Sequence, residues 1–366
     1  MRILIIGGGI FGTSIANTLA YGKNEIDLSE AEHDILQLAS RVNHNRIHLG
    51  YHYLRSIQTA EQSIEGLLSF LFNYGEAVIH QLPNYYAIAS EGSKTSPTEF
   101  INFCNNVGIG YDFAYPGKEF FNLEKIGECF KVPEPVWNYT KLKSIIKENL
   151  AKARVNLLLK TPCLYLKKLP DQTFEAKFPT HVKRYDVVIN TSYLNTNTIN
   201  GYLGLPLKSM LFENVIIPVF KYKSHPIGLT IMDGPFCSVM PRGGSKDEFL
   251  LYHVKHSIVQ SQIAENCPDF EQNGKPVDDL DAQRAIYQES AKFMPFLRSA
   301  EFAGFNKTIR MVYQNSDDAR ITELNTYPEL KNYFSVFSGK VTTCIQVALD
   351  IKQQLEGKQG AKRLKI

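Results

Sequence analysis

The sequence predicts an α/β protein that combines a Rossmann-like domain with a second, β-rich domain. The chain opens with an apolar strand, a glycine turn and an amphipathic helix. Residues 210–260 contain short apolar runs separated by Gly, Asp and Pro turns, which is typical of a mainly antiparallel sheet. Helical spacing of apolar residues returns over 340–355. Elements typical of a nucleotide-binding domain therefore lie on both sides of a β-rich middle.

The N-terminal elements follow the hydrophobic pattern of a βαβ unit. Residues 2–6 form a continuous apolar run, and residues 10–19 repeat apolar side chains at near-helical spacing. Residues 25–30 alternate apolar and polar side chains, which indicates a second strand. A longer amphipathic helix is predicted over 56–72, and residues 90–98 are expected to interrupt regular structure.

The central and C-terminal elements are shorter and more often strands. A helix is expected to follow Thr140 as its N-cap and to run to Ala153. The predicted strands are 155–159, 163–169, 173–178, 185–192, 214–220, 228–232, 236–241, 249–254, 308–313 and 333–337. The predicted helical segments in the C-terminal third are 280–297 and 340–355.

The length of 366 residues predicts two domains. The order of the elements predicts that the nucleotide-binding domain is discontinuous, because its strands and helices occur at both ends of the chain and in the centre. We expect this domain to comprise residues 1–85, 150–210 and 306–366. The substrate domain would then comprise residues 86–149 and 211–305.

Composition excludes several classes of function. Forty Lys and Arg residues against 37 Asp and Glu leave a net charge of +3, which is too small for a nucleic-acid-binding surface. No apolar run approaches the ~18 residues of a transmembrane helix. The six cysteines include no C-x-x-C pair, so we expect reduced cysteines and a cytoplasmic protein.

A glycine motif follows the first strand. Gly7, Gly9 and Gly12 form G-x-G-x-x-G between a strand and a helix. In such a turn the first glycine allows the tight bend, the second lets backbone approach a pyrophosphate, and the third permits close packing of helix and strand. Glu30 ends the next strand, where an acid binds the adenosine ribose. The unit therefore predicts dinucleotide binding; a packing turn without a ligand is the alternative.

The segment 39–55 is dense in histidine and arginine. His44, His48 and His52 are spaced by four, which on a helix would place three imidazoles on one face and suggest a metal site. Gly50 and the lack of an apolar helical stripe disfavour a helix here. We therefore predict no metal site, with the three-histidine arrangement as the alternative.

The same segment carries a family resemblance. Residues 47–54, IHLGYHYL, resemble the I-H-G-G-L-R-Y-L segment of FAD-dependent glycerol-3-phosphate dehydrogenases, and residues 39–41 match the wider D-amino-acid-oxidase-like family. In this sequence His52 replaces an arginine of the dehydrogenases, and Leu49 replaces a glycine. The resemblance implies an FAD-binding fold, but not the same substrate.

The resemblance also implies roles for residues in this segment. Four would bind the cofactor, with the first two near the pyrophosphate and the last two beside the isoalloxazine: Ser40, Arg41, His48 and Gly50. His52 and Tyr53 would face the substrate. Since a neutral imidazole promotes the loss of a hydroxyl proton, His48 is expected as the base ahead of His52, with a pH dependence near about pH 6 to 7.

The C-terminal third extends the resemblance. Residues 338–343, SGKVTT, resemble the G-G-K-x-T-T motif of the same dehydrogenases, which implies cofactor contacts from Gly339, Lys340, Thr342 and Thr343. Arg310 lies where those enzymes hold the substrate's anion; a surface arginine in an ion pair is the alternative. Residues 308–316 contain no cysteine for a covalent flavin bond, so we expect noncovalent FAD.

These features predict an FAD-dependent oxidoreductase that oxidises a small anionic substrate at a CH–OH carbon. Amine or amino-acid oxidation is the alternative, and an NAD-dependent dehydrogenase or a non-catalytic protein of the same fold are rival classes. The electron acceptor stays open among oxygen, a quinone and a protein. The basic C-terminus, residues 358–366, is expected to be a solvated tail; peripheral contact with an anionic membrane is the alternative.

Overall fold

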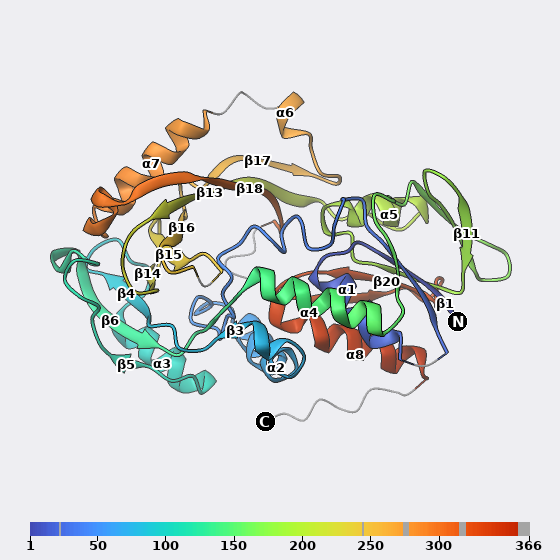
Figure 1. The fold of residues 1–366 in the computed structure, drawn as a ribbon, viewed down its shortest axis with the longest axis horizontal. Coiled ribbons are helices and arrows are strands. Elements are labelled where there is room, and N and C mark those ends of the chain that lie inside the picture. The colour runs from blue at the N-terminus through green and yellow to red at the C-terminus, as the bar shows by residue number, and fades with distance from the viewer. Residues whose placement is uncertain (22, 244, 274–277, 315–319, 358–366) are drawn as a thin grey trace.

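Two large β-sheets occupy opposite ends of the molecule in the computed structural model (Figure 1). The structure describes residues 1–366 except 22, 244, 274–277, 315–319 and 358–366. The predicted α/β architecture, with a Rossmann-like part and a second, β-rich part, is present. The chain passes between the two sheets several times, as the colours of Figure 1 show.

The six-stranded sheet contains the N-terminal strands. Its order is β19 (Glu323–Thr326), β20 (Tyr333–Phe337), β12 (Val187–Asn190), β1 (Arg2–Ile6), β2 (Glu25–Ser29) and β8 (Asn156–Leu158). All neighbouring pairs are parallel except β19 with β20. Strands from both ends of the chain and from its centre thus form one sheet.

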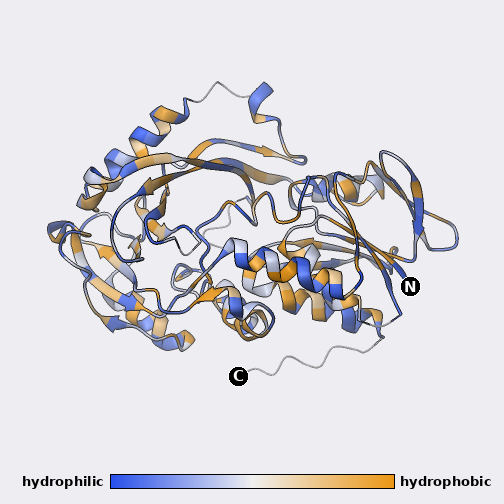
Figure 2. Ribbon diagram, viewed as in Figure 1, coloured by the Kyte–Doolittle hydropathy of each residue, from blue (hydrophilic) through white to orange (hydrophobic). Residues whose placement is uncertain are grey.

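Helices cover one face of this sheet, and a small sheet covers the other. The helical layer consists of α1 (Ile10–Leu19), α2 (Ile57–Tyr74), α4 (Tyr139–Lys152) and α8 (Cys344–Leu355). Their apolar stripes pack on strand residues such as Ile5 and Val187 (Figure 2). The opposite face packs on β9 (Tyr165–Lys168), β10 (Phe174–Lys177), β11 (Val182–Tyr185) and α5 (Thr196–Tyr202).

The nine-stranded sheet is mainly antiparallel. Its path runs through β17 (Ile258–Ala264), β13 (Met210–Lys221), β16 (Glu248–His253), β15 (Cys237–Pro241), β14 (Gly228–Met232), β4 (Asn84–Ala89), β6 (Ile126–Val132) and β5 (Asp112–Phe113). The ninth strand, β18 (Glu301–Tyr313), pairs with β13. Only β4 and β14 are parallel neighbours.

Short helices complete the second part. On one face, α7 (Asp279–Ala291) and η4 (Pro295–Ser299) pack against apolar residues of the sheet. On the other face, α3 (Pro97–Val107) packs near β4. The remaining elements are α6 (Phe270–Asn273), η1 (Gly75–Ala77), η2 (Leu123–Lys125), η3 (Tyr193–Asn195), η5 (Val341–Thr343) and the paired strands β3 (Val78–Ile79) and β7 (Val136–Trp137).

Several local predictions need correction. The N-cap of α4 is Asn138, whose side chain accepts a hydrogen bond from the Lys141 backbone N–H, and not Thr140. Helix α3 was not predicted, although Ser96 and Glu99 form a capping box there. The two-residue strand β5 and the seven-residue strand β17 were also missed, because neither shows a strong alternating pattern.

Two stretches lie with the sheet opposite to the one expected for them. Helix α4, placed in the substrate domain by the sequence prediction, contributes Leu142 and Ile146 to the core of the six-stranded sheet. Residues 306–313, placed in the nucleotide domain, belong to β18 of the nine-stranded sheet. The exact domain boundaries stay a prediction.

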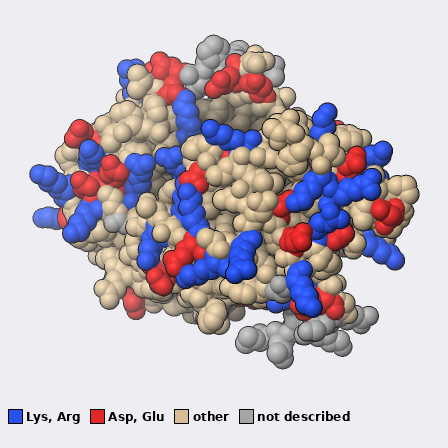
Figure 3. Space-filling view, turned by 45° about the vertical axis from the view of Figure 1, so that its right-hand side comes forward, with Lys and Arg blue, Asp and Glu red and all other residues tan. Residues whose placement is uncertain are grey.

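The surface charges and the helix lengths bear on two of the expectations drawn from composition. Basic and acidic side chains are interspersed over the face shown in Figure 3. No helix in the described part of the chain is long and apolar enough to cross a membrane. The basic segment 358–366 lies outside the described residues, so the structure does not bear on its contact with a membrane.

Candidate functional site

The glycine turn between β1 and α1 is tightly packed at two of its three glycines. Gly7 has a φ of +108°, a conformation that residues with a side chain rarely adopt. A Cβ at Gly12 would lie 1.9 Å from the Gly7 carbonyl oxygen. Both positions therefore require glycine for the backbone itself, which places α1 close against β1.

Gly9 differs, because the space beside it is open. The nearest atom to a Cβ at Gly9 would be the Ser40 Oγ at 3.5 Å, an ordinary contact. Ser40 Oγ in turn accepts a hydrogen bond from the Ile10 backbone N–H at 3.1 Å. The first turn of α1 thus offers backbone donors beside an open glycine, which fits the pyrophosphate of a dinucleotide.

Glu30 lies at the carboxyl end of β2, beside this turn. Its carboxylate accepts hydrogen bonds from the backbone N–H groups of Gly8, at 2.6 Å, and Glu32, at 2.8 Å. These bonds fix the carboxylate next to the glycine turn. This is the position from which an acid binds the ribose of a dinucleotide.

The SGKVTT loop packs tightly between α2 and residues 320–322. A Cβ at Gly339 would lie 2.2 Å from the Arg320 carbonyl oxygen, and a Cβ at Gly66 in α2 would lie 2.5 Å from the Thr342 carbonyl oxygen. Thr322 Oγ1 accepts from the backbone N–H groups of Gly339 and Lys340. The loop is therefore held rigidly ahead of α8.

Lys340 projects from this loop toward residues of the segment 39–55. Its Nζ lies 4.3 Å from the centroid of the Tyr53 ring. The His48 ring lies 5.7 Å from the Tyr53 ring and 5.4 Å from the His52 ring, centroid to centroid. The structure thus brings Lys340 of the SGKVTT loop together with three residues of the segment 39–55.

A buried ion pair lies behind the two histidines. Arg46 Nη1 lies 3.2 Å from Glu134 Oε2, and both side chains are almost fully buried. Arg46 also donates to the Tyr86 hydroxyl at 3.0 Å and to Thr230 Oγ1 at 2.6 Å. Sequence reasoning missed this network, because its members come from a loop, two strands and the segment before β7.

The Tyr86 hydroxyl fixes the tautomer of His52. It lies 2.6 Å from both Glu134 Oε2 and His52 Nδ1, and it has one proton to donate. An ionised carboxylate cannot approach the phenol oxygen so closely without a proton between them, so Tyr86 donates to Glu134. His52 Nδ1 must then carry its own proton and donate to Tyr86, which leaves His52 Nε2 as an acceptor.

The burial of this cluster controls its protonation. Burial, reinforced by the charge of Lys340, lowers the pKa of His48 to about 4, although Glu134 opposes the shift. Burial and the Arg46 charge hold the pKa of His52 well below its usual value. Burial would raise the pKa of Glu134, but its contacts with His48 and Arg46 outweigh this and lower it. At neutral pH both imidazoles are therefore neutral and Glu134 is ionised.

Burial also changes the pKa of Lys340. Burial lowers the pKa of the Lys340 ammonium to about 7. A nearby negative charge would restore the ammonium, because an opposite charge favours the charged form. Lys340 is thus suited to respond to an anion at this place.

A row of side chains crosses the nine-stranded sheet beside the cluster. Cross-strand pairing places Tyr86, Thr230, Ser238 and Tyr252 in neighbouring positions on four adjacent strands. Because directly paired residues share a face, their polar tips point the same way. The segment 44–46 runs over this row: Ser238 Oγ lies 3.3 Å from His44 Nδ1, and Arg46 binds the Tyr86 end.

Arg310 lies at the other end of the row. Its guanidinium carbon is 5.9 Å from the centroid of the Tyr252 ring, and its Nε donates to Glu213 Oε2 at 2.7 Å. Arg310 and Glu213 are direct partners on β18 and β13. The predicted anion-binding arginine is therefore in an ion pair, and its binding of a substrate anion stays a proposal.

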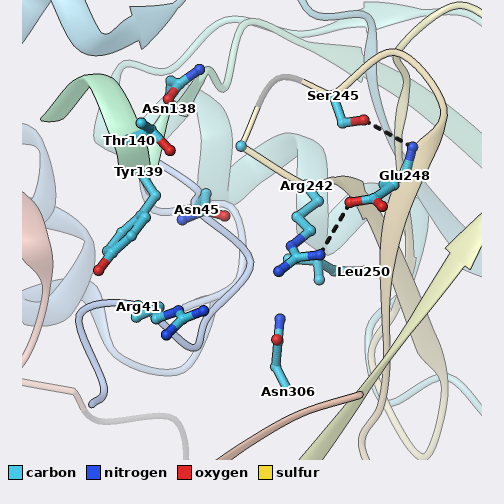
Figure 4. A pocket seen from close by; sticks show the side chains of 11 residues that line it. Arg41, Asn45, Asn138, Tyr139, Thr140, Arg242, Ser245, Glu248, Leu250 and Asn306 are labelled. Carbon is cyan, nitrogen blue, oxygen red and sulfur yellow. Dashed lines mark hydrogen bonds and ion pairs between the residues drawn. The ribbon is translucent and has the colours of Figure 1, made fainter. Parts of the chain in front are cut away.

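Two other predicted residues occupy distinct places. Gly50 has a φ of +110°, and a Cβ there would lie 2.9 Å from the Ala60 side chain, so it allows the chain to pass close to α2. Arg41 lines a separate pocket that contains no residue of the glycine turn (Figure 4). This placement does not support the expected contact of Arg41 with the pyrophosphate.

Among the described residues, the structure does not contain the alternative metal site, in which three histidines lie on one face of a helix. Residues 43–56 form no helix, and His44 faces Ser238 and not the other two histidines. Ligand atoms of His48, His52 and Glu134 do lie within 4.8 Å of one another. However, Arg46 already forms an ion pair with the Glu134 carboxylate, so its positive charge disfavours a metal cation there.

The family of FAD-dependent oxidoreductases denoted DAO has a model that matches residues 2–333. The chain is 26% identical to the FAD-dependent monooxygenase FPY4 of Fusarium mangiferae, over 93% of this chain and 87% of that protein. It is 24% identical to the FAD-dependent monooxygenase kojA of Aspergillus flavus, over 96% of this chain and 85% of that protein.

Solved structures show the same fold at low identity. Glycine oxidase from Geobacillus kaustophilus matches with a TM-score of 0.78 and 14% identity, over 100% of this chain and 97% of its own. L-α-glycerophosphate oxidase from Mycoplasma pneumoniae, with FAD bound, matches with a TM-score of 0.76 and 14% identity, over 99% of this chain and 96% of its own.

Proposed function

Because the chain belongs to the DAO family of FAD-dependent oxidoreductases, we propose that it oxidises a small anionic substrate at a carbon that bears a hydroxyl group. The chain is a FAD-dependent enzyme of this family, and the proposal concerns the substrate and the residues that act on it. The cluster of the half-buried His48 and His52 with the buried Glu134 is the observation that carries it.

The residues present fit FAD. The open side of Gly9 and the donors of α1 suit the pyrophosphate, and Glu30 suits the ribose. The SGKVTT loop, with Lys340 and the helix N-terminus behind it, suits the flavin ring. We keep the expectation that FAD binds noncovalently. When bound, FAD supplies the hydride acceptor for the oxidation.

His48 is proposed as the base. Oxidation of an alcohol requires removal of the hydroxyl proton, and a neutral imidazole accepts it. The Glu134 carboxylate, 3.6 Å from His48 Nδ1, stabilises the imidazolium that forms. His52 Nε2, held as an acceptor through Tyr86, is left to accept from a second donor group of the substrate, because the single hydroxyl proton goes to His48.

Two features support binding of the rest of the substrate. Lys340 gains its proton beside a negative charge and so favours an anionic group or an electron-rich ring nearby. Tyr53, 6% exposed, forms an aromatic wall between Lys340 and His48. Arg310 is proposed to hold the substrate's anion through its terminal nitrogens, since its Nε is taken by Glu213.

Amino-acid oxidation is the second candidate. The Arg310–Glu213 pair presents a cation and a carboxylate together, which complements the two charges of a zwitterion. Solved structures of the same fold include two glycine oxidases. An amine can be neutral when it reacts, so this chemistry depends less on His48.

Anaerobic reduction of the bound flavin tests the proposal. The purified holoenzyme is mixed with 2-hydroxy acids, polyol phosphates and amino acids, and bleaching of the visible flavin absorbance is followed. We expect bleaching by a hydroxy compound, slowed when the hydrogen on the reacting carbon is replaced by deuterium. Bleaching by amino acids alone would favour the second candidate, and no bleaching by any member of the panel would contradict both.

A further inference from the structure

A polar pocket lies apart from the glycine turn and the histidine cluster. It has a volume of about 500 Å³ and is bounded by the start of α4, the β15–β16 hairpin and residues of the segment 39–55 (Figure 4). Leu250 and Glu248 of β16 line it from the same face of the sheet as Tyr252. The pocket therefore adjoins the polar row that leads to Thr230 and Tyr86.

Asn45 supplies an unused donor to this pocket. Its side chain is 3% exposed, and its Nδ2 has no hydrogen-bond partner within the described ranges of the chain. The backbone holds it in place, because Asn45 donates to Asn43 Oδ1 at 2.7 Å and accepts from the Trp137 N–H at 2.8 Å. A buried amide donor without a partner is costly, so a ligand that accepts from it would be stabilised.

The charges around Asn45 favour an anion. Arg41 lines the pocket below Asn45 in Figure 4 and forms no ion pair with any residue that the structure describes. The second arginine, Arg242, lies 3.1 Å from Glu248, so one cation of the two is balanced. The lining thus keeps a net positive charge, carried by Arg41.

The start of α4 adds donors on the opposite side. The Asn138 side chain caps the Lys141 N–H, and the first N–H groups of any helix have no intrahelical acceptor. The partial positive charge at this 14-residue helix's N-terminus favours a negative ligand. Thr140 contributes a hydroxyl group to the same wall.

We propose that this pocket binds a carboxylate or phosphate group of a small molecule between Arg41, Asn45 and the N-terminus of α4. The guanidinium of Arg41 and the amide of Asn45 donate to the oxygens of the anion, and Arg242 lies across the pocket from them. Two sources share this chemistry: the distal anionic end of the oxidised substrate, and a free anion that binds independently of it.

The chain contains a built-in reporter for this test. Trp137 is its only tryptophan, is 2% exposed, and is joined to Asn45 through the backbone hydrogen bond. Inorganic phosphate is titrated into the holoenzyme at constant ionic strength, with chloride as the reference anion, and Trp137 fluorescence is recorded. We expect a saturable change with phosphate and none with chloride.

Three variants assign the binding to the pocket. Arg41→Ala removes an exposed side chain, and Asn45→Asp keeps the shape while it replaces the donor with a carboxylate. Each should weaken phosphate binding at least about tenfold. Arg298→Ala, an exposed arginine outside the pocket lining, is the charge-matched control and should bind as wild type.

Competition with the substrate distinguishes the two sources of the anion, and the phosphate titration tests the pocket itself. Phosphate that competes with the substrate for flavin reduction identifies the substrate's own anionic end, and phosphate that binds without competing identifies a free anion. A failed substrate panel leaves the fluorescence titration unaffected, so the two proposals fail separately. The absence of saturation up to roughly 50 mM phosphate, or unchanged binding in both Arg41→Ala and Asn45→Asp, overturns the pocket.

Discussion

The glycine turn and the histidine cluster are built in opposite ways. The turn draws its glycines and Glu30 from one contiguous stretch, residues 7–30, and the closest contacts of Gly7 and Gly12 are with backbone. The cluster draws Arg46, Tyr86, Glu134 and Thr230 from distant segments, and its contacts are made by side chains. The proposed cofactor site can therefore be found locally in the sequence, whereas the proposed substrate site depends on the tertiary fold.

The largest expected effect separates cofactor binding from folding within the glycine turn. Gly9→Val should abolish FAD uptake and leave the fold intact, because only Ser40 Oγ, at 3.5 Å, lies near the added Cβ. Gly12→Ala should instead destabilise the fold by about 3 kcal/mol, since its Cβ would overlap the Gly7 carbonyl. Flavin absorbance and thermal unfolding measure the two effects. Full flavin content in Gly9→Val would remove this turn from the proposed cofactor site.

Replacement of the proposed base addresses the cluster. His48→Gln should slow flavin reduction by about 10² to 10⁴-fold. In the wild type, the rate should fall only as the pH drops through about 4, where His48 becomes protonated, and not near pH 6 to 7 as its ordinary pKa suggests. Stopped-flow reduction across pH gives both quantities, with His52→Gln as the comparison. A wild-type rate in His48→Gln would favour amine oxidation.

The ion pair behind the base tests how far the cluster depends on tertiary structure. Glu134→Gln leaves the buried Arg46 charge without its counter-ion and should cost about 3 to 5 kcal/mol of unfolding free energy. The double variant Arg46→Met/Glu134→Gln should recover part of this loss. Urea unfolding of the wild type, the single variants Glu134→Gln and Arg46→Met, and the double variant measures the coupling. Additive losses would show that the two charges do not interact.

Loss of Arg310, the predicted anion-binding residue, should weaken substrate binding more than it slows the chemical step. Arg310→Ala should raise KM about tenfold for an anionic substrate and leave flavin content unchanged, because Arg310 faces Glu213 and Tyr252 and not the glycine turn. Arg284→Ala, in an exposed pair with Asp281, is the control. An unchanged KM would assign Arg310 to the structural ion pair alone.

The smallest expected effect concerns the pH dependence of Lys340. Because its pKa lies at about 7, the ammonium is lost as the pH rises through neutrality. At low substrate concentration, where the substrate-free enzyme sets the rate, flavin reduction should therefore decline a few-fold above pH 7. Lys340→Arg, which stays charged, should not show this decline. Parallel alkaline profiles of the two proteins would exclude Lys340 as the titrating group.

The sequence predicted the fold and the glycine turn better than the side-chain network around Glu134. Strand β1, the glycine turn and Glu30 have local signals, and the family resemblance located Lys340 and His48. Glu134 carries no such signal, since it is a single acid between two prolines whose role depends on Arg46. The depressed pKa of His48 was equally inaccessible, because burial is a property of the packed protein.

The segment that follows β2 touches both halves of the molecule. Ser40 bonds to the N-terminus of α1 beside the six-stranded sheet, and six residues later Arg46 bonds to Thr230 in the nine-stranded sheet. Any opening that separates the sheets must break one of these attachments. Occupancy of the glycine turn should therefore slow amide hydrogen exchange in β14 as well as in β1, so that a ligand bound at one sheet protects the backbone of the other.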